Sequence, residues 1–216
     1  MTKTTIPQVT DAPIIIIGGG GHTRVLIDVL ETLNATIQGI VTQDEALVGT
    51  SMLGVPVLSL ERDFKADPGK VLLVNGVGNR ARTGDSGLKV REAAAERYKN
   101  LGFRFVSVIS PHAVLSRHTV LGEGVQVLHD AVVQPVAHVG GHTIINSAAV
   151  VEHDCRIGMY CHIAPGAVLC GNVMVGNHAH IGANSTIVQG LVIGDRVIVA
   201  AGVRVARNVA SGETVK

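Results

Sequence analysis

Branched aliphatic residues recur at every sixth position through the second half of the chain. The unbroken series is Ile109, Leu115, Leu121, Val127, Val133, Val139, Ile145, Val151, Ile157, Ile163, Leu169, Val175, Ile181, Ile187, Ile193, Val199 and Val205. Four residues after each member lies a second position that usually holds a small or short side chain, such as Ala131, Cys155 or Ala167. Two inward positions in six residues do not match the 3.6-residue period of an α-helix. They predict a short strand and a tight corner, repeated, as in a parallel β-helix.

A second period indicates how many sides each coil has. Five glycines directly follow a member of the aliphatic series and are eighteen residues apart: Gly122, Gly140, Gly158, Gly176 and Gly194. Three hexads therefore form one coil, and residues eighteen apart should stack about 4.8 Å from each other. We predict a left-handed parallel β-helix over residues 109–216.

The pattern before Ile109 alternates between apolar runs and amphipathic segments. The predicted strands cover residues 13–17, 37–41, 71–74 and 103–108, and the predicted helices cover residues 22–33 and 90–101. Strands alternating with helices are typical of a parallel α/β unit. We therefore predict that residues 1–108 form a Rossmann-like half domain.

Glycines 18–21 and His22 join the first predicted strand to the first predicted helix. In an α/β sheet this turn presents backbone N–H groups at a helix N-terminus, where phosphates bind. Thr23 stands where the third glycine of a dinucleotide motif belongs, and the sheet is too short for two nucleotide-binding halves. The turn favours a nucleotide or nucleotide-sugar over NAD, and the alternative is a tight turn without a ligand.

A second glycine-containing loop, residues 75–80, follows the third predicted strand. Gly76, Gly78 and Asn79, with nearby arginines, suit the other side of the same phosphate site, because the carboxyl ends of parallel strands share one edge. The alternative is a polar turn between two elements.

Composition excludes several classes of function. The formal net charge is +1 and aromatic residues make up 2% of the chain, so nothing indicates nucleic-acid binding. No apolar run approaches the roughly 18 residues of a membrane span, and no signal peptide is evident, which favours a cytoplasmic protein. Cys155, Cys161 and Cys170 are expected to be small buried hydrophobes.

His153 is the first candidate for chemistry in the repeat. It follows the inward Val151 by two residues, which predicts an outward side chain, and it lies between Glu152 and Asp154. A carboxylate beside an imidazole raises its basicity and holds one tautomer, as a general base requires. Gly171, eighteen residues later, predicts open space one coil above the ring.

His162 lies nine residues after His153, which is half a coil away and on a different edge of the prism. One chain is therefore not expected to bring both rings to one small ligand. A homotrimer of prisms packed side by side would do so, with active sites between subunits.

The other histidines give a weaker signal. His178 and His180 share an outer turn, but the ligand spacing of a zinc-binding prism is absent, so we predict no metal site. The remaining repeat histidines are expected to be solvated corner residues: His112, His118, His129, His138 and His142.

Several motifs together resemble a known family. They are I-I-I-I-G-G-G-G-H near the start, G-V-G-N-R in the middle, I-N-S-A-A-V-V-E-H-D-C-R-I-G in the repeat and C-G-N-V after it. These segments resemble hexapeptide-repeat acyltransferases of the sialic-acid O-acetyltransferase and bacterial nucleotide-aminosugar N-acetyltransferase type, including those of bacillosamine and perosamine synthesis. The likeness covers almost the whole chain.

The resemblance implies a role for each matching residue. It implies that His153 is the general base, Asp154 its acidic partner and Asn146 a supporting polar residue. For the cosubstrate acetyl-CoA, the matching residues are His162, Gly171, Ala183 and Ala201. For the nucleotide-sugar, they are Gly20, Gly21, His22 and Gly78, to which the loop adds Asn79. Thr42, Gln43 and Asp44 replace an Asp-Asp pair of UDP-binding members, so the base could differ from uracil.

These observations predict an acetyl-CoA-dependent N-acetyltransferase that modifies a nucleotide-linked 4-amino-4,6-dideoxysugar without a covalent acyl-enzyme. One alternative is an O-acetyltransferase of a sialic acid or another sugar hydroxyl. The non-enzymatic alternative is a nucleotide-sugar-binding or purely structural β-helix protein.

Overall fold

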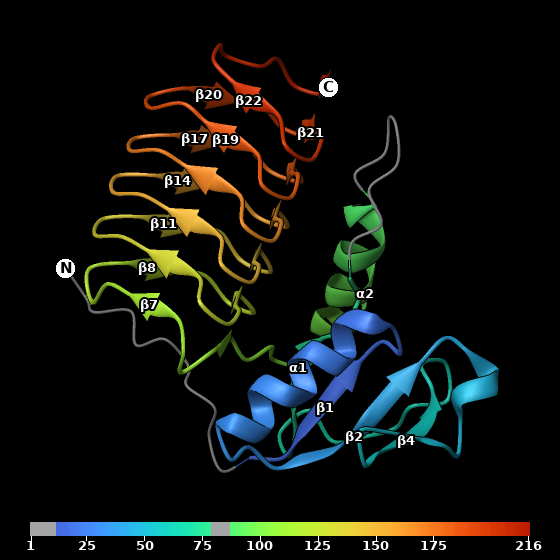
Figure 1. The fold of residues 1–216 in the computed structure, drawn as a ribbon. Helices are drawn as coiled ribbons and strands as arrows, with labels where there is room; N and C mark the ends of the chain where they lie inside the picture. The colour runs from blue at the N-terminus through green and yellow to red at the C-terminus, as the bar shows by residue number, and fades with distance from the viewer. Residues whose placement is uncertain (1–11, 79–86) are drawn as a thin grey trace.

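The computed structural model describes residues 12–78 and 87–216. A small five-stranded sheet with two helices lies at one end of the molecule, and a long β-helix follows it along the chain (Figure 1). The change of pattern near Ile109 coincides with the first strand of the β-helix, Val108–Ile109. The division into two domains at residue 108 stays a prediction.

The N-terminal sheet has the strand order β3-β4-β2-β1-β5. Its strands are β1 (Ile14–Ile17), β2 (Ile37–Thr42), β3 (Ser51–Met52), β4 (Val55–Leu60) and β5 (Leu72–Asn75). All neighbours are parallel except the β3–β4 pair. The four isoleucines of β1 are at most 1% exposed, as expected for a central parallel strand covered on both faces.

Two predictions in this part were wrong. The pair β3–β4 was missed, because β4 alternates buried and exposed residues around Pro56 and lacks a continuous apolar run. The strand predicted at residues 103–108 is reduced to one isolated bridge, Leu73 to Phe105. Its end, β6 (Val108–Ile109), pairs with β9 and so belongs to the β-helix.

Two helices cover opposite faces of the sheet. Helix α1 (Gly21–Thr32) buries Leu26, Ile27, Val29 and Leu30 against one face. Helix α2 (Leu88–Asn100) packs Ala94, Ala95 and Tyr98 against the other. A short 3-10 helix, η1 (Glu45–Leu47), follows β2, and the sheet places both glycine loops at the carboxyl ends of β1 and β5.

The β-helix consists of two-residue strands in three parallel sheets of six, five and seven strands. The first sheet comprises β7 (Val114–Leu115), β10 (Val132–Val133), β13 (Val150–Val151), β16 (Val168–Leu169), β19 (Thr186–Ile187) and β22 (Arg204–Val205). The second comprises β8 (Val120–Leu121), β11 (His138–Val139), β14 (Arg156–Ile157), β17 (Met174–Val175) and β20 (Val192–Ile193). The third comprises β6, β9 (Gln126–Val127), β12 (Ile144–Ile145), β15 (His162–Ile163), β18 (His180–Ile181), β21 (Ile198–Val199) and β23 (Thr214–Val215).

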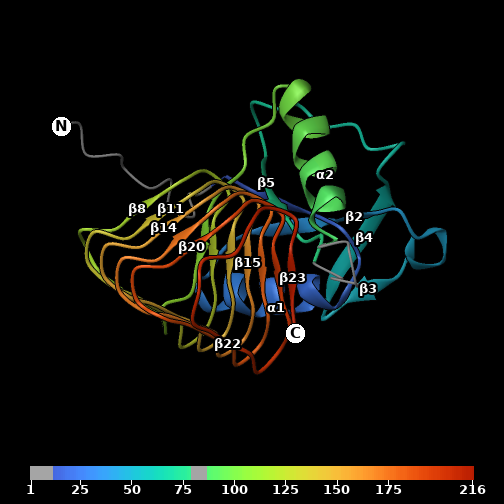
Figure 2. The same ribbon diagram turned by 90° about the horizontal axis from the view of Figure 1, so that it is seen from above.

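The predicted eighteen-residue register is confirmed. For example, Ile144 pairs with His162, and His162 with His180. Figure 2 looks along the stack of coils, which superimpose on one another. The hydrophobic cluster inside them consists of aliphatic residues, alanines and two cysteines, and Thr143 and Ser185 are the polar residues buried at inward positions of the described repeat. Because the inward side chains alternate between branched and small, the channel leaves no space for a ring.

The glycine column is confirmed as a close approach between coils. A Cβ atom on Gly140 would lie 2.5 Å from the Gly158 carbonyl carbon and 2.6 Å from the Met159 nitrogen. Backbone atoms of the next coil therefore occupy the space that a side chain would need.

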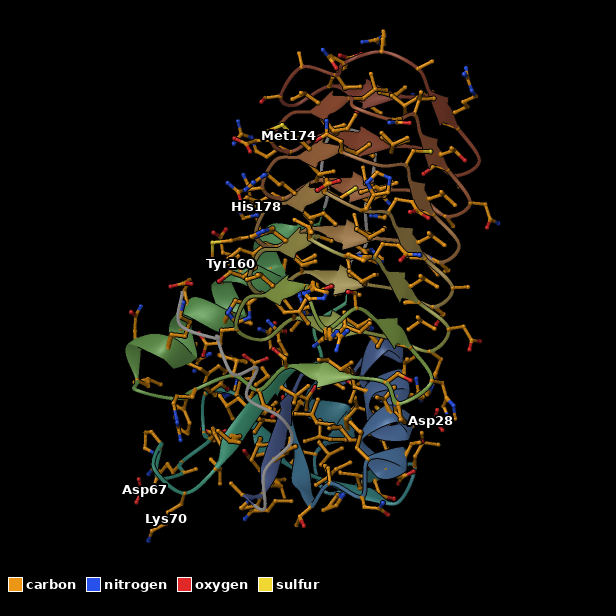
Figure 3. The ribbon with its side chains drawn as sticks, turned by 90° about the vertical axis from the view of Figure 1, so that its left-hand side faces the viewer. Asp28, Asp67, Lys70, Tyr160, Met174 and His178 are labelled. Carbon is orange, nitrogen blue, oxygen red and sulfur yellow. The ribbon has the colours of Figure 1, made fainter. Side chains whose placement is uncertain are left out.

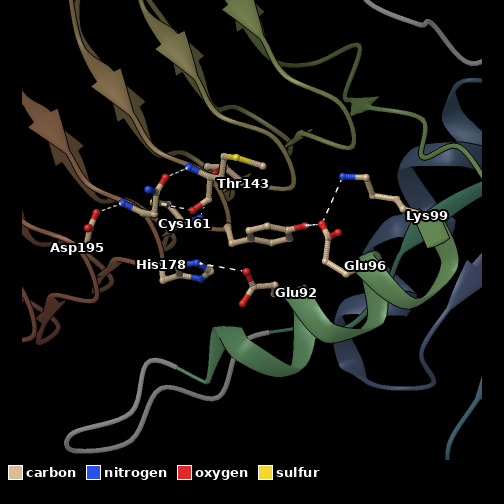
Figure 4. Close-up of polar contacts among 10 residues, drawn as sticks. Glu92, Glu96, Lys99, Thr143, Cys161, His178 and Asp195 are labelled. Atoms are coloured by element: carbon tan, nitrogen blue, oxygen red, sulfur yellow. Dashed lines mark hydrogen bonds and ion pairs between the residues drawn. The ribbon is translucent and has the colours of Figure 1, made fainter.

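Helix α2 docks on one corner of the β-helix. The Tyr160 hydroxyl donates to Glu96 at 2.7 Å, and His178 lies 3.5 Å from Glu92 (Figure 4). Figure 3 shows Tyr160 and His178 at successive levels of the β-helix. The Tyr160 ring stacks on both His142 and His178.

The prediction that the corner histidines are solvated was wrong for His142. This ring is 1% exposed and lies between Phe105 and Tyr160, because α2 and the segment that follows it cover its corner. His129 is also held in place, by Ser110 at 2.7 Å and by Asp28 of α1 at 3.0 Å. Sequence periodicity places these rings on the outside of the coil but does not show what covers the outside.

Candidate functional site

His153 and Asp154 form an exposed pair at the corner after β13. The His153 Nδ1 lies 2.8 Å from Asp154 Oδ2, and both side chains are more than half exposed. A carboxylate only accepts, so Nδ1 carries the proton in this pair and Nε2 is left as the basic nitrogen. Asp154 is therefore the carboxylate in contact with His153, and its catalytic role stays a prediction. Asp154 has a φ of 62°, the left-handed corner conformation that aspartate tolerates.

The His153 ring fills the space next to Gly171. A Cβ atom on Gly171 would lie 2.7 Å from both Cε1 and Nε2 of the ring. The space expected to be open one coil later is thus filled by the imidazole itself, because the ring lies directly against Gly171. Gly171 fixes the ring by permitting close contact with the backbone.

Asn146 lies with His162 rather than with His153. Its Oδ1 accepts the Ser147 N–H at 2.8 Å, which orients the amide, so Nδ2 donates to His162 Nε2 at 2.9 Å. His162 is neutral, because burial first, and then nearby positive charge, lower its pKa to about 3. The ring therefore carries its proton on Nδ1, and this buried N–H has no hydrogen-bond partner among the described residues.

His22 is held by a residue of the β-helix that sequence reasoning missed. Gln126 donates through Nε2 to the Asn75 carbonyl at 2.8 Å and accepts from His22 Nε2 at 2.7 Å. Burial, followed by the charge of Arg91, lowers the pKa of His22 to about 4, so the ring is neutral and its Nδ1 is an acceptor. The sequence did contain a signal for this role of Gln126. Its amide occupies a strand position whose neighbours in the adjacent coils, Val108 and Ile144, are aliphatic.

The two glycine loops lie side by side, as predicted. Gly76 donates its N–H to the Ile17 carbonyl at 2.7 Å, and a Cβ atom on Gly18 would lie 3.1 Å from Gly76. Thr23, which breaks the dinucleotide motif, joins them: its buried hydroxyl donates to the Gly18 carbonyl at 2.8 Å, and Gly76 O is 3.3 Å away. A third glycine would lose this connection.

The glycine turn at residues 18–21 borders open space at its last two residues. Cβ atoms on Gly20 and Gly21 would meet nothing within 4 Å, and α1 begins without a side-chain cap on its first N–H groups. Uncapped N–H groups at a helix N-terminus attract anions. Gly78 packs on His22, with a Cβ atom 3.1 Å from His22 Cβ. The predicted Asn79 lies outside the described residues.

The residues predicted for acetyl-CoA occupy two different corners of the prism. Gly171 follows β16 on the corner of His153. Ala183 follows β18 and Ala201 follows β21, in the sheet of His162, and the Gly202 N–H binds the Ala183 carbonyl at 2.8 Å. Among the described residues, no hydrogen bond, ion pair or ring contact joins His153 to His162. Within the described part of one chain His153 and His162 are therefore not in contact, and a site shared between subunits stays a prediction.

Two surface pockets lie away from all of these residues. One, of about 550 Å³, lies under the N-terminal sheet near Phe64, and one of about 440 Å³ lies on the β14–β20 face near Met174. Within residues 12–78 and 87–216, no three His, Cys, Asp or Glu side chains group closely enough to hold a metal ion. In the same ranges no helix is long and apolar enough to cross a membrane.

Several known proteins are similar to this chain in sequence and fold. The family model for bacterial transferase hexapeptide (six repeats) matches residues 172–207. No curated protein matches the chain. The acetyltransferase domain of PglB from Neisseria gonorrhoeae is 30% identical, with 94% of this chain and 95% of that chain covered and a TM-score of 0.85.

Two further solved structures match over nearly the full length. PerB from Caulobacter crescentus, in complex with CoA and GDP-perosamine, is 34% identical, with 94% of this chain and 92% of that chain covered and a TM-score of 0.82. WeeI from Acinetobacter baumannii is 26% identical, covers 93% of this chain and 94% of its own, and has a TM-score of 0.80. The chain belongs to the hexapeptide-repeat β-helix sugar acetyltransferases.

Proposed function

We propose that the protein transfers the acetyl group of acetyl-CoA to the amino group of a nucleotide-linked 4-amino-4,6-dideoxysugar. The observation that carries this proposal is the His153–Asp154 pair, whose basic nitrogen lies against Gly171. The similar PerB structure contains both CoA and GDP-perosamine, which supports the same two substrates here.

His153 acts as the general base. Asp154 accepts the proton of Nδ1 and stabilises the imidazolium that forms, so Nε2 takes a proton from the substrate amine as it attacks. The amine nitrogen bonds to the thioester carbonyl carbon, and the C–S bond then breaks with departure of the CoA thiolate. The amide product and free CoA leave, and the proton on His153 passes to the thiolate. No acyl-enzyme forms.

His162 and Asn146 belong to the acetyl-CoA half of the site. The Asn146 amide fixes the tautomer of His162, which leaves the Nδ1–H as a donor. We assign this donor, together with backbone N–H groups, to acetyl-CoA. Ala183 and Ala201 offer a surface without long side chains for the pantetheine arm, on the same side of the prism as His162.

The nucleotide-sugar lies against the two glycine loops. The uncapped start of α1 and the open space at Gly20 and Gly21 suit a diphosphate. His22, held neutral with its Nδ1 as an acceptor, suits a hydroxyl or amine of the sugar. The Rossmann-like character of this part, the left-handed sense of the β-helix and the cytoplasmic location stay predictions.

The active protein is a homotrimer with sites between subunits. The sheet that contains β13 carries an outward row of valines: Val114, Val132, Val150 and Val168. One edge of this sheet ends at His153, and the other edge adjoins the corner of Ala183 and Ala201. Packing prisms through this face brings His153 of one subunit toward His162 of the next, and buries the valines.

The base assignment is tested by His153→Ala, with His118→Ala as the matched control at an exposed position two coils earlier on the same corner. Transfer is measured as release of the CoA thiol with an aminosugar nucleotide. We expect His153→Ala to lose at least ~10²-fold in kcat, within the range for general base catalysis, and His118→Ala to keep wild-type rates. Near-normal transfer by His153→Ala would refute the assignment. Product stability to hydroxylamine distinguishes an amide from the ester that O-acetylation would give.

The shared site is tested by mixing two inactive variants, His153→Ala and Asn146→Ala. If the two groups come from neighbouring subunits, random trimers regain about a quarter of wild-type activity. If both groups act within one chain, mixing restores nothing. Light scattering gives the oligomeric mass, expected at three times the 22.5 kDa of the chain.

A further inference from the structure

Arg91 is a fully buried cation that neither the motifs nor the proposed mechanism uses. It lies on α2 with no exposed surface. Its Nη1 donates to the Asn75 and Val77 carbonyls, each at 2.8 Å, and its Nε donates to the His142 carbonyl at 3.0 Å. Arg91 therefore ties the second glycine loop to α2 and to the β-helix.

Asn75 also binds Arg91 through its side chain. Its Nδ2 donates to the Arg91 carbonyl at 2.9 Å, and its Oδ1 accepts the Val77 N–H at 3.1 Å. Its own carbonyl also accepts from Gln126, which holds His22. The loop, the helix and the candidate substrate histidine are thus connected by one hydrogen-bond network.

The positive charge of Arg91 has no carboxylate partner among the described residues. All three of its acceptors are backbone carbonyls, and its Nη2 has no partner in the same part of the chain. Other charges of α2 pair elsewhere: Lys99 with Glu96, and Arg97 with Glu61. Burial lowers the pKa of Arg91 to about 9, so it remains a cation at neutral pH.

A buried cation without a counterion is costly, so an anion that binds within reach of its charge is favoured. The charge of Arg91 reaches both halves of the candidate site. Burial is the main cause of the lowered pKa of His22 on the nucleotide side, and Arg91 comes second. For His162 on the acetyl-CoA side, Arg91 contributes after burial, His180 and His22. The anion that approaches His22 and the glycine loops in the proposed reaction is the diphosphate of the nucleotide-sugar.

We propose that Arg91 is a positioning residue of the nucleotide-sugar site. It fixes the loop at residues 75–78, and its buried charge favours the bound diphosphate through the loop backbone. This role rests on the proposed nucleotide substrate. It requires no direct contact between the guanidinium and the ligand.

The test compares Arg91→Gln, which removes the charge, with Arg91→Lys, which keeps it. Calorimetry and NMR titration measure the binding of UDP and GDP against uridine and guanosine. We expect Arg91→Gln to weaken diphosphate binding about tenfold or more, while nucleoside binding changes less than about twofold. The reason is that the charge of Arg91 attracts the anionic diphosphate and not the uncharged nucleoside. Arg91→Lys should retain most of the diphosphate preference. In kinetics, the KM for the nucleotide-sugar rises and the KM for acetyl-CoA does not.

Tyr160→Phe is the matched control, because it loosens the docking of α2 through Glu96 but leaves the Arg91 charge in place. It should keep the wild-type ratio of diphosphate to nucleoside affinity. An equal loss in Tyr160→Phe and Arg91→Gln would overturn the proposal, as would a folded Arg91→Gln with an unchanged ratio.

If Arg91→Gln does not fold, the proposal is tested on the wild-type protein by NMR. The Arg91 Nε–H signal in NMR should shift on addition of UDP or GDP and not on addition of the nucleosides. An unchanged signal with diphosphate bound overturns the role of Arg91 alone. Absence of any diphosphate binding to the wild-type protein overturns the nucleotide substrate itself, and this role with it.

Discussion

Gly171→Ala adds one methyl group where the His153 ring lies. The new Cβ atom would be 2.7 Å from Cε1 and Nε2, whereas ordinary contact begins near 3.4 Å. The ring must therefore move by at least about 0.7 Å, the difference between these distances, or rotate away from Asp154. Misplacement of a catalytic group by about 1 Å can cost 10²-fold in rate. We expect kcat to fall about 10²-fold.

The same substitution should leave the fold intact. The His153 side chain is 55% exposed, so the ring is free to move toward solvent. We expect a change of less than about 1 kcal/mol in the free energy of unfolding, or less than about 4 °C in Tm. Loss of activity without loss of stability is the signature of a displaced base.

The assay is steady-state thiol release with both substrates varied, on Gly171→Ala and on Gly69→Ala as the control. Gly69 lies on the N-terminal part, where an added Cβ meets the Asp67 carboxylate at 3.3 Å. The control should keep wild-type kcat. An unchanged kcat in Gly171→Ala would refute the idea that this glycine positions His153. A raised KM for acetyl-CoA with normal kcat would assign Gly171 to cosubstrate binding only.

Two further predictions concern stability. Gly140→Ala places a Cβ 2.5 Å from the Gly158 backbone. The free energy of unfolding should therefore fall by at least about 3 kcal/mol. A Tm within about 2 °C of wild type would contradict this prediction. The pKa of buried His142 falls from 6.5 to about 3 in the folded protein. The unfolded chain therefore binds an extra proton between these values, and stability is full above pH 6.5 and falls by up to about 1.4 kcal/mol per pH unit below it. Denaturant unfolding at pH 7.5, 6 and 5 should show a shallower pH dependence for His142→Asn, and equal slopes would exclude the effect.

The structure of the β-helix could be predicted from the six-residue repeat because every coil makes the same contacts with the next one. Each strand pairs with the strand eighteen residues away, so the inward positions, the stacked glycines and the outward His153 all follow from one period. The His153–Asp154 contact is also local, between adjacent residues. The same reasoning failed at residues 103–108, where a locally apolar segment is divided between the sheet and the first coil.

The chain alone therefore determined the β-helix, the coil length and the outward position of His153 beside Asp154. Only the tertiary structure decided that Gln126 orients His22 across 104 residues, that Asn146 partners His162, and that α2 buries Arg91 beneath the second glycine loop. The physical reason is that strand pairing and corner conformation depend on short, repeated spacings. Burial of a polar group, its tautomer and its pKa depend on whichever distant segment packs over it.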